Sequence, residues 1–235
     1  MSEKILEIKN LNVWYKKRNS IISDLSFHLD KNEIVGLIGL NGAGKTTLIK
    51  VLSGLLEGYN YDSICFDGNP FSFRDSKFKN QRYTVFSEDY SFGYFTFREY
   101  LSYVFSAYSK KLPDVSELVA GFHFEKYENK LLKDLSMGNR KKVNLITAFA
   151  LKTPILFLDE PVNGLDFQST EFLYSLISGY KEHGTILFSS HIAESITLTS
   201  DRVMVLDNGK ISHSFSGEKI TTESIRKVLR LDNVI

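Results

Sequence analysis

The chain has 235 residues, of which 43% are hydrophobic and 24% charged, so it can bury a sizeable core as one compact unit. Its formal net charge of +1 argues against bulk electrostatic attraction to nucleic acid, and its single cysteine, Cys65, excludes an internal disulfide. No apolar run approaches the roughly 20 residues that a membrane-spanning helix needs, and the polar start of the chain is unlike a signal peptide. We therefore expect a protein that is not itself a membrane channel.

The first predicted elements are strands. Residues 11–15 end in Trp14 and Tyr15 and lead into a polar turn at 16–20, and a second strand is predicted over 22–29. An aromatic residue that ends a strand is more often part of the core than part of a binding site. The two rings therefore need a wider sequence context before either can be given a role.

A phosphate-binding loop follows at residues 39–46. Its sequence matches the pattern G-x-x-x-x-G-K-[ST] and lies between an apolar strand at 34–38 and a helical stretch at 47–56. The glycines let successive backbone N–H groups converge on phosphate oxygens at a helix N-terminus. Lys45 adds a positive charge near the β- and γ-phosphates, and Thr46 offers a hydroxyl to Mg²⁺. The residues predicted to bind the nucleotide are Gly39, Leu40, Asn41, Gly42, Ala43, Gly44, Lys45, Thr46 and Thr47.

The next region is unusually aromatic. Residues 83–108 include eleven Phe or Tyr, whereas an even spread of the chain's aromatics would place roughly three there, and such enrichment is typical of interface cores. Helices are predicted over 97–108 and 115–122, with a break at Pro113. Helical spacing assigns one stripe to the core: Phe97, Tyr100, Leu101, Val104, Phe105 and Tyr108. The aromatic residues off this stripe, which favour a partner surface, are Phe92, Tyr94, Phe95 and Tyr103.

An apolar strand at residues 155–158 ends in two carboxylates, Asp159 and Glu160. Ligands in open α/β sheets bind beyond the carboxyl ends of the strands. Asp159 can therefore reach a hydrated Mg²⁺, and Glu160 can face the water that attacks the γ-phosphate. Taken alone, the same pair could equally be a solvated turn.

Three further segments complete the pattern. Residues 135–139 read Leu-Ser-Met-Gly-Asn and precede a basic stretch and a predicted helix at 143–151. Residues 162–166 read Val-Asn-Gly-Leu-Asp and follow the carboxylate pair directly. A strand predicted at 185–188 leads into Ser-Ser-His, which ends at His191. A strand over 203–206 and a helix over 221–230 are predicted near the end of the chain.

Together these segments resemble the ATP-binding-cassette (ABC) ATPases, in an arrangement like that of bacterial exporter subunits. The signature loop of that family reads LSGGQ. This chain matches it at Ser136 and Gly138 and departs from it at Met137 and Asn139. The resemblance runs from the N-terminal aromatic strand to His191 and implies ATP and Mg²⁺ as cofactors.

The resemblance also implies a fold and a division of the chain. The fold is α/β, a P-loop NTPase (RecA-like) core with an antiparallel β edge and an inserted α-helical subdomain. The chain would be a single ABC ATPase domain over 1–235, with the core at about 1–86 and 152–215. The helical subdomain would cover about 87–151, and a short helical tail would cover 216–235.

Site roles follow from the same resemblance. Ser136 and Gly138 would contact the γ-phosphate of an ATP held by a partner subunit, and Asp166 would communicate across that dimer. His191 would hydrogen-bond the γ-phosphate and the catalytic water, and would share the catalytic role with Glu160. Tyr15 would stack on adenine, because it leads directly into the polar turn; Trp14 is the alternative.

The hinge between the core and the helical subdomain, which carries a glutamine in most family members, matches least well. Counting back from Thr96 places Ser87 at this position, with Glu88 one residue later. We favour Glu88, because a carboxylate is a better ligand for a hard cation than a hydroxyl. The predicted Mg²⁺ ligands are thus Thr46, Asp159 and Glu88.

The function implied is that of the ATP-hydrolysing, energy-coupling subunit of a membrane transporter. The chain would work as a head-to-tail dimer, a homodimer or a heterodimer, with a separate integral-membrane subunit and without nucleic acid. It would be cytoplasmic and peripheral on the inner face of the cell membrane. An exporter of peptide, drug or surface polymer is favoured. The alternatives are an importer subunit and a soluble ABC-type ATPase that remodels a macromolecular complex.

Overall fold

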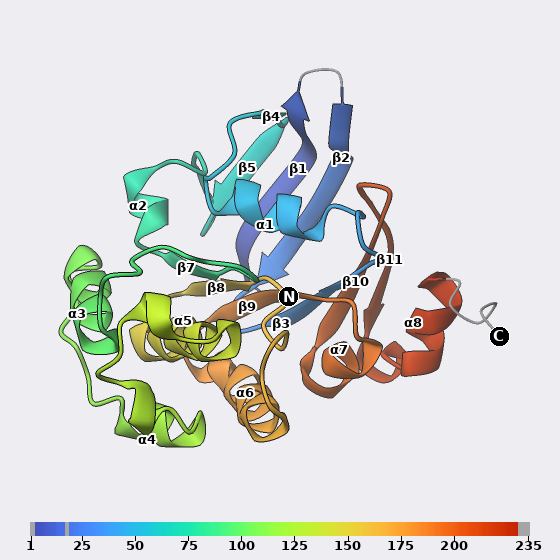
Figure 1. Cartoon of the computed structure of the whole chain (residues 1–235). Coiled ribbons are helices and arrows are strands. Elements are labelled where there is room, and N and C mark those ends of the chain that lie inside the picture. The colour runs from blue at the N-terminus through green and yellow to red at the C-terminus, as the bar shows by residue number, and fades with distance from the viewer. Residues whose placement is uncertain (1–2, 17–18, 230–235) are drawn as a thin grey trace.

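The computed structural model of the chain describes residues 3–16 and 19–229, arranged around two β-sheets (Figure 1). The first sheet is antiparallel, in the order β2-β1-β5-β6, and β4 also pairs with β1. Its strands are β1 (Lys4–Lys16), β2 (Asn19–Asp30), β4 (Tyr59–Asn60), β5 (Ser63–Phe66) and β6 (Asn69–Pro70). This sheet is the antiparallel part of the predicted fold.

The second sheet has six strands in the order β11-β10-β3-β9-β8-β7. Five of its strands are parallel, and β11 pairs antiparallel with β10 at one edge. The strands are β3 (Ile34–Ile38), β7 (Arg82–Val85), β8 (Ile155–Leu158), β9 (Thr185–Ser190), β10 (Arg202–Asp207) and β11 (Lys210–Ser216). Strands β3, β8 and β9 are buried along their whole length, as expected for parallel strands covered on both faces.

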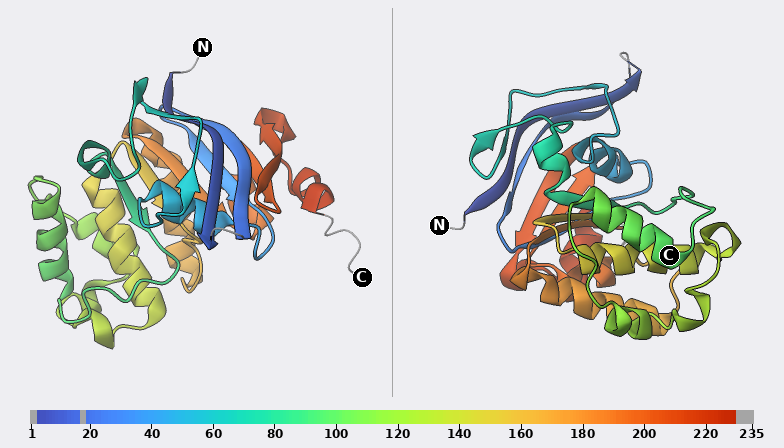
Figure 2. Two further views of the ribbon diagram at one scale, coloured as in Figure 1. Left: turned by 90° about the horizontal axis from the view of Figure 1, so that it is seen from above. Right: turned by 90° about the vertical axis from the view of Figure 1, so that its left-hand side faces the viewer.

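Helices cover both faces of the parallel sheet (Figures 1 and 2). Helix α1 lies between the two sheets, whereas α5, α6 and α7 lie on the opposite face, and α3 and α4 extend beyond the β7 edge. The helices are α1 (Lys45–Leu52), α2 (Ser76–Lys79), α3 (Phe97–Ala107), α4 (Ser116–Gly121), α5 (Met137–Leu151), α6 (Phe167–Gly179), α7 (Ala193–Thr199) and α8 (Thr222–Leu229). Short 3₁₀ turns are η1 (Glu125–Tyr127), η2 (Leu132–Asp134), η3 (Tyr180–Glu182) and η4 (Gly217–Lys219).

The apolar side chains form two cores, one on each face of the parallel sheet. One core joins α1 to β1, β2 and the inner face of the parallel sheet. The other joins the opposite face to α3, α4, α5, α6 and α7. Helix α5 contributes to this second core along most of its length, so the helical region and the sheet share one continuous apolar interior.

The predicted strands at 34–38 and 155–158 are confirmed, but two predicted helices differ at their ends. Helix α1 ends at Leu52 rather than at 56, because Gly54 follows its last turn in the left-handed conformation. Helix α5 begins at Met137 rather than at 143, because the Ser136 hydroxyl caps it by accepting a hydrogen bond from a backbone N–H. Three predicted positions, Lys17 and Arg18 in the turn and Arg230 in the last helix, lie outside the described residues.

Candidate functional site

The phosphate-binding loop lies where the fold predicts, between the carboxyl end of β3 and the start of α1. Gly44 directly precedes α1, so the first N–H groups of the helix face the loop. The Lys45 ammonium donates to the backbone carbonyl of Gly39 at 2.7 Å and to that of Leu40 at 3.4 Å. The lysine is buried, and its side chain lies against its own loop. Its positive charge is therefore located where the phosphates would bind.

Thr46 and Asp159 meet at the base of the loop. The Thr46 hydroxyl lies 3.0 and 3.1 Å from the two carboxylate oxygens of Asp159. Asp159 is fully buried, and it also accepts hydrogen bonds from the hydroxyls of Ser189 at 2.8 Å and Ser87 at 3.3 Å. A carboxylate and a hydroxyl in contact provide the hard oxygen donors that Mg²⁺ prefers, so these residues fit the ion.

Glu160 joins this cluster to His191. One carboxylate oxygen of Glu160 lies 2.8 Å from His191 Nδ1, and the other lies 3.6 Å from Lys45 Nζ. The backbone N–H of Glu160 donates to the Ser189 hydroxyl at 2.9 Å. Glu160 has a φ of +48°, a left-handed conformation that is uncommon for a residue other than glycine. The carboxylate is thus held by both its side-chain contacts and its backbone geometry.

Lys45, Thr46, Glu160 and His191 border an open cavity of about 560 Å³. It is lined by Ile21, Asn41, Gly42, Gly44, Lys45, Thr46, Thr47, Ser87, Glu88, Glu160, Asn163 and His191. Sequence reasoning did not select Ile21 or Asn163. Asn163 could have been found from its position three residues after Glu160, but Ile21 reaches the cavity only because β2 passes beside the loop.

Ser87 and Glu88 both line this cavity, as Thr46 does, so both hinge candidates border the same space as this predicted Mg²⁺ ligand. Ser87 contacts Asp159 through its hydroxyl. Glu88 is exposed to solvent.

Eight of the predicted site residues are not among those that line this cavity: Tyr15, Gly39, Leu40, Ala43, Ser136, Gly138, Asp159 and Asp166. Tyr15 is 55% exposed at the end of β1, whereas Trp14 is half-buried and packs against Gly58. Ser136 is exposed at the start of α5. At Gly138 a Cβ atom would lie only 2.2 Å from the carbonyl oxygen of Gly164, so the signature loop packs directly on the 162–166 segment.

Asp166 is held by two local contacts. Its carboxylate accepts a hydrogen bond from Lys142 Nζ at 2.7 Å and another from the backbone N–H of Ser169 at 2.9 Å. Through the second hydrogen bond Asp166 caps the N-terminus of α6. The hydrogen bond from Lys142, followed by that from the Ser169 backbone, holds the pKa of Asp166 well below its usual range. Asp166 is therefore ionised at neutral pH and ties α5 to the start of α6.

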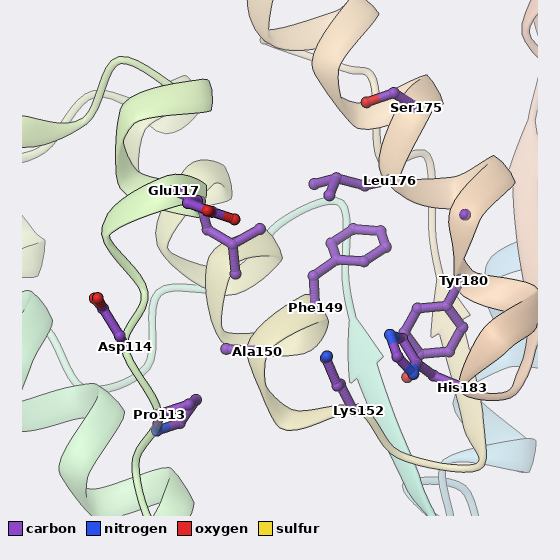
Figure 3. Close-up of a pocket in the computed structure, with 12 residues that line it drawn as sticks. Pro113, Asp114, Glu117, Phe149, Ala150, Lys152, Ser175, Leu176, Tyr180 and His183 are labelled. Atoms are coloured by element: carbon purple, nitrogen blue, oxygen red, sulfur yellow. The ribbon is translucent and has the colours of Figure 1, made fainter.

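A separate cavity of about 410 Å³ opens between α4, the end of α5 and α6 (Figure 3). The rings of Phe149 and Tyr180 border it, and Tyr180 lies beside His183. None of the site residues predicted from the sequence lines this cavity.

Comparisons with known proteins agree with this geometry. The family model described as "ABC transporter" matches residues 22–163. "Putative ABC transporter ATP-binding protein AlbC" of Bacillus subtilis (strain 168) is 39% identical over 88% of this chain and 90% of its own. "SkfA peptide export ATP-binding protein SkfE" of the same organism is 31% identical, over 88% and 87%. "Spermidine/putrescine import ATP-binding protein PotA" of Clostridium novyi (strain NT) is 29% identical, over 100% and 70%.

Among solved structures, "Structure of ATP binding subunit of ABC transporter" superposes with a TM-score of 0.82 at 28% identity, over 98% of this chain and 95% of that one. The chain therefore belongs to the ABC transporter ATP-binding family. It is an ATP-binding subunit with the P-loop NTPase fold, and proteins of this family hydrolyse ATP. Among the described residues, no helix is long and apolar enough to cross a membrane.

Proposed function

We propose that this chain hydrolyses ATP to drive an exporter of peptides, drugs or surface polymers whose membrane-spanning part is a separate chain. The observation that carries this proposal is the convergence of Lys45, Thr46, Glu160 and His191 around one cavity, with the buried Asp159 in contact with Thr46. Export is supported by the relative named for peptide export, and the relative named for import makes an importer subunit the second candidate.

In the proposed mechanism two such chains close head to tail around two ATP molecules. Lys45 and the loop N–H groups bind the β- and γ-phosphates of one nucleotide, while Ser136 and Gly138 of the other chain contact its γ-phosphate. The exposure of Ser136 at a helix N-terminus supports this role, because such N–H groups attract anions. Tyr15 stacks on the adenine.

Thr46 and Asp159, with Glu88 or Ser87 from the hinge, would hold Mg²⁺, which would neutralise charge on the phosphates when bound. Glu160 accepts a proton from water as the water oxygen bonds to the γ-phosphorus and the bond to the ADP oxygen breaks. His191 orients Glu160 and stabilises the transferred phosphoryl group. Loss of the bridging γ-phosphate lets the two chains separate, with Asp166 coupling the two sites.

The membrane partner would dock on the region of residues 87–151, the proposed helical subdomain. Tyr90, Tyr94 and Tyr103 expose large aromatic surfaces there, and exposed apolar patches of this kind mark interaction sites. Docking would place the protein in the cytoplasm, peripheral on the inner face of the membrane.

The test is affinity purification of the tagged chain from detergent-solubilised membranes of its own organism, followed by identification of what binds. An integral-membrane protein recovered in a fixed ratio, with ATPase activity, is the expected result. Whether the substrate accumulates inside or outside vesicles made with that complex separates import from export. Recovery of ribosomes or chromatin without a membrane protein would instead establish the soluble remodelling ATPase.

A further inference from the structure

The feature that the proposed mechanism leaves unused is a buried lysine in the signature helix. Lys141 lies in the second turn of α5, and only 3% of it is exposed. Its ammonium donates to the backbone carbonyl of Phe86 at 3.1 Å and to that of Glu160 at 3.4 Å. Phe86 directly follows β7, and Glu160 lies two residues beyond β8. One side chain from α5 therefore bridges the carboxyl ends of two neighbouring parallel strands.

Burying this ammonium has an energetic cost. Burial lowers the pKa of Lys141 to about 8, although Asp159, Glu160 and Glu88 act in the opposite direction. An apolar side chain of the same length would fill this space without that cost. The distinctive property of the lysine is its ability to donate hydrogen bonds to both carbonyls at once.

Both carbonyls belong to backbone that positions groups at the ATP cavity. Glu160 has the left-handed backbone conformation, its N–H is held by Ser189, and its carbonyl is held by Lys141. Hydrogen bonds on both sides of the residue fix the direction in which its carboxylate points toward His191. The Phe86 carbonyl precedes the peptide of Ser87, which contacts Asp159.

Helix α5 connects Lys141 to the signature loop at residues 135–139. Ser136 caps α5, and Lys141 follows it by five residues in the same helix, so a rigid element joins the two. In the proposed dimer Ser136 contacts the ATP bound by the other chain, whereas Glu160 acts on the ATP bound by its own chain. Any displacement of the start of α5 is therefore transmitted to the Glu160 carbonyl.

We propose that Lys141 is a positioning residue that couples the two ATP sites: through α5, contact of Ser136 with the partner's ATP sets the orientation of Glu160 in the same chain. The inference rests on the proposed head-to-tail dimer. It assigns to Lys141 an effect on turnover and on cooperativity between the sites, and none on the binding of nucleotide to the phosphate loop.

The experiment compares Lys141→Met and Lys141→Arg with a matched control, Lys110→Met. Lys110 donates to the backbone carbonyls of Leu151 at 2.7 Å and Lys152 at 3.2 Å, at the far end of the same helix. The control thus removes a lysine with the same kind of contacts on α5, away from the ATP cavity. Turnover, the KM for ATP and the Hill coefficient are measured for each purified variant, together with its melting temperature.

We expect Lys141→Met to lower kcat by about 10- to 100-fold, the size of effect that follows a small misplacement of a catalytic group. KM should stay within about twofold of the wild type, and the Hill coefficient should fall toward 1. Lys141→Arg, which keeps donors for both carbonyls, should recover turnover, and Lys110→Met should keep kcat and cooperativity.

Three results would overturn the inference. Wild-type kcat and cooperativity in Lys141→Met would remove the lysine from the coupling. Equal losses of kcat in Lys141→Met and Lys110→Met would reduce both lysines to stabilisers of α5. A Met variant that fails to fold would assign Lys141 a purely structural role. The proposed function is judged separately, because its test is the recovery of an integral-membrane protein, with ATPase activity, on the tagged wild-type chain.

Discussion

At the scale of single residues, Glu160 is the group whose surroundings say most about its chemistry. Its carboxylate contacts His191 and lies near Lys45, and both contacts would be rearranged by a phosphate in the cavity. Lys45 donates a hydrogen bond to a carbonyl of its own loop and lies 3.6 Å from the Glu160 carboxylate. The phosphates of ATP offer this lysine a stronger partner, which would free the glutamate to face water.

Glu160→Gln is therefore expected to keep ATP binding and to lower turnover by roughly 10²- to 10⁴-fold, the usual contribution of a general base. The amide keeps the shape of the side chain and loses the ability to accept the proton. With hydrolysis blocked, an ATP-dependent dimer should accumulate and be detected by gel filtration. Wild-type turnover in this variant would remove Glu160 from the chemistry.

Lys45→Ala should act on binding instead. The phosphates lose their main cation, so the affinity for ATP should fall by about 10- to 100-fold, the value of a hydrogen bond to a charged group. Calorimetric titration with ATP measures this directly. The matched control is Lys50→Ala, which removes a lysine from the last turn of the same helix. An unchanged affinity in Lys45→Ala would refute the assignment of the phosphate loop.

At the scale of elements, two buried tyrosines and one half-buried tyrosine join the region of α3 to β7. The hydroxyls of Tyr83 and Tyr100 lie 2.9 Å apart, and the Tyr108 hydroxyl donates to the Arg82 carbonyl at 2.7 Å. Burial raises the pKa of Tyr100 to about 12 and that of Tyr108 to about 12, and it also raises the pKa of Tyr83. The neutral phenols are therefore part of the packing between the helical region and the sheet.

These shifts predict a loss of stability in alkali. Because the folded pKa values exceed the unfolded value of about 10, the contribution is complete below pH 10 and is lost as pH rises toward 12. Denaturant unfolding followed by circular dichroism between pH 9 and 12 measures this decline. In the folded protein the absorbance of the Tyr100 and Tyr108 phenolates should appear near pH 12, and its appearance near pH 10 would contradict the prediction. Tyr108→Phe should lose one late-titrating phenol.

Elements with a local signal could be predicted from the sequence, and elements without one could not. Strands β3 and β8 are continuous apolar runs, and Phe97, Leu101 and Phe105 follow the helical spacing that buries them. Strand β11 is largely exposed and polar, so hydropathy did not reveal it. Its signal was the Asn208-Gly209 pair, both in left-handed backbone, which is typical of a tight hairpin turn.

The residues of the candidate site also fall into two groups, those that a sequence motif predicts and those that it does not. The phosphate loop and the carboxylate pair are contiguous in sequence, so their residues could be predicted from the pattern alone. Ser189, which contacts both Asp159 and Glu160, and Lys141, which holds the Glu160 carbonyl, come from other elements. Their contacts depend on the order β9-β8-β7 in the sheet and on the packing of α5 against it, neither of which a motif contains.

At the scale of the whole molecule, the aromatic region between β7 and α3 contains both core and surface. Phe92 is 38% exposed, and its ring packs within 5.4 Å, between centroids, of Phe95, Tyr100 and Tyr103. Tyr94 is 78% exposed, and the Lys133 ammonium lies 4.2 Å from its ring centroid. Phe92 therefore supports the local structure, whereas Tyr94 offers most of its ring to a partner.

This division separates a docking role from a packing role. Tyr94→Ser should leave the melting temperature and basal ATPase activity close to those of the wild type, because the lost ring is mostly in solvent. It should abolish or strongly weaken association with the membrane subunit, since aromatic side chains dominate the energy of interface cores. Thermal melting, phosphate release and co-purification of the same preparation measure the three quantities.

The matched control is Phe97→Ser in the fully buried stripe of α3. Removing a buried aromatic ring costs about 3–5 kcal/mol of unfolding free energy, and a buried hydroxyl without a partner adds to that loss. The core variant should therefore lose stability and ATPase activity together, whereas the surface variant should lose only its partner. A large drop in melting temperature in Tyr94→Ser, with activity lost in parallel, would contradict the docking role, because it would show that this ring stabilises the ATP site through the helical region. Normal co-purification of a stable Tyr94→Ser would also contradict it, and would move the docking surface away from this ring.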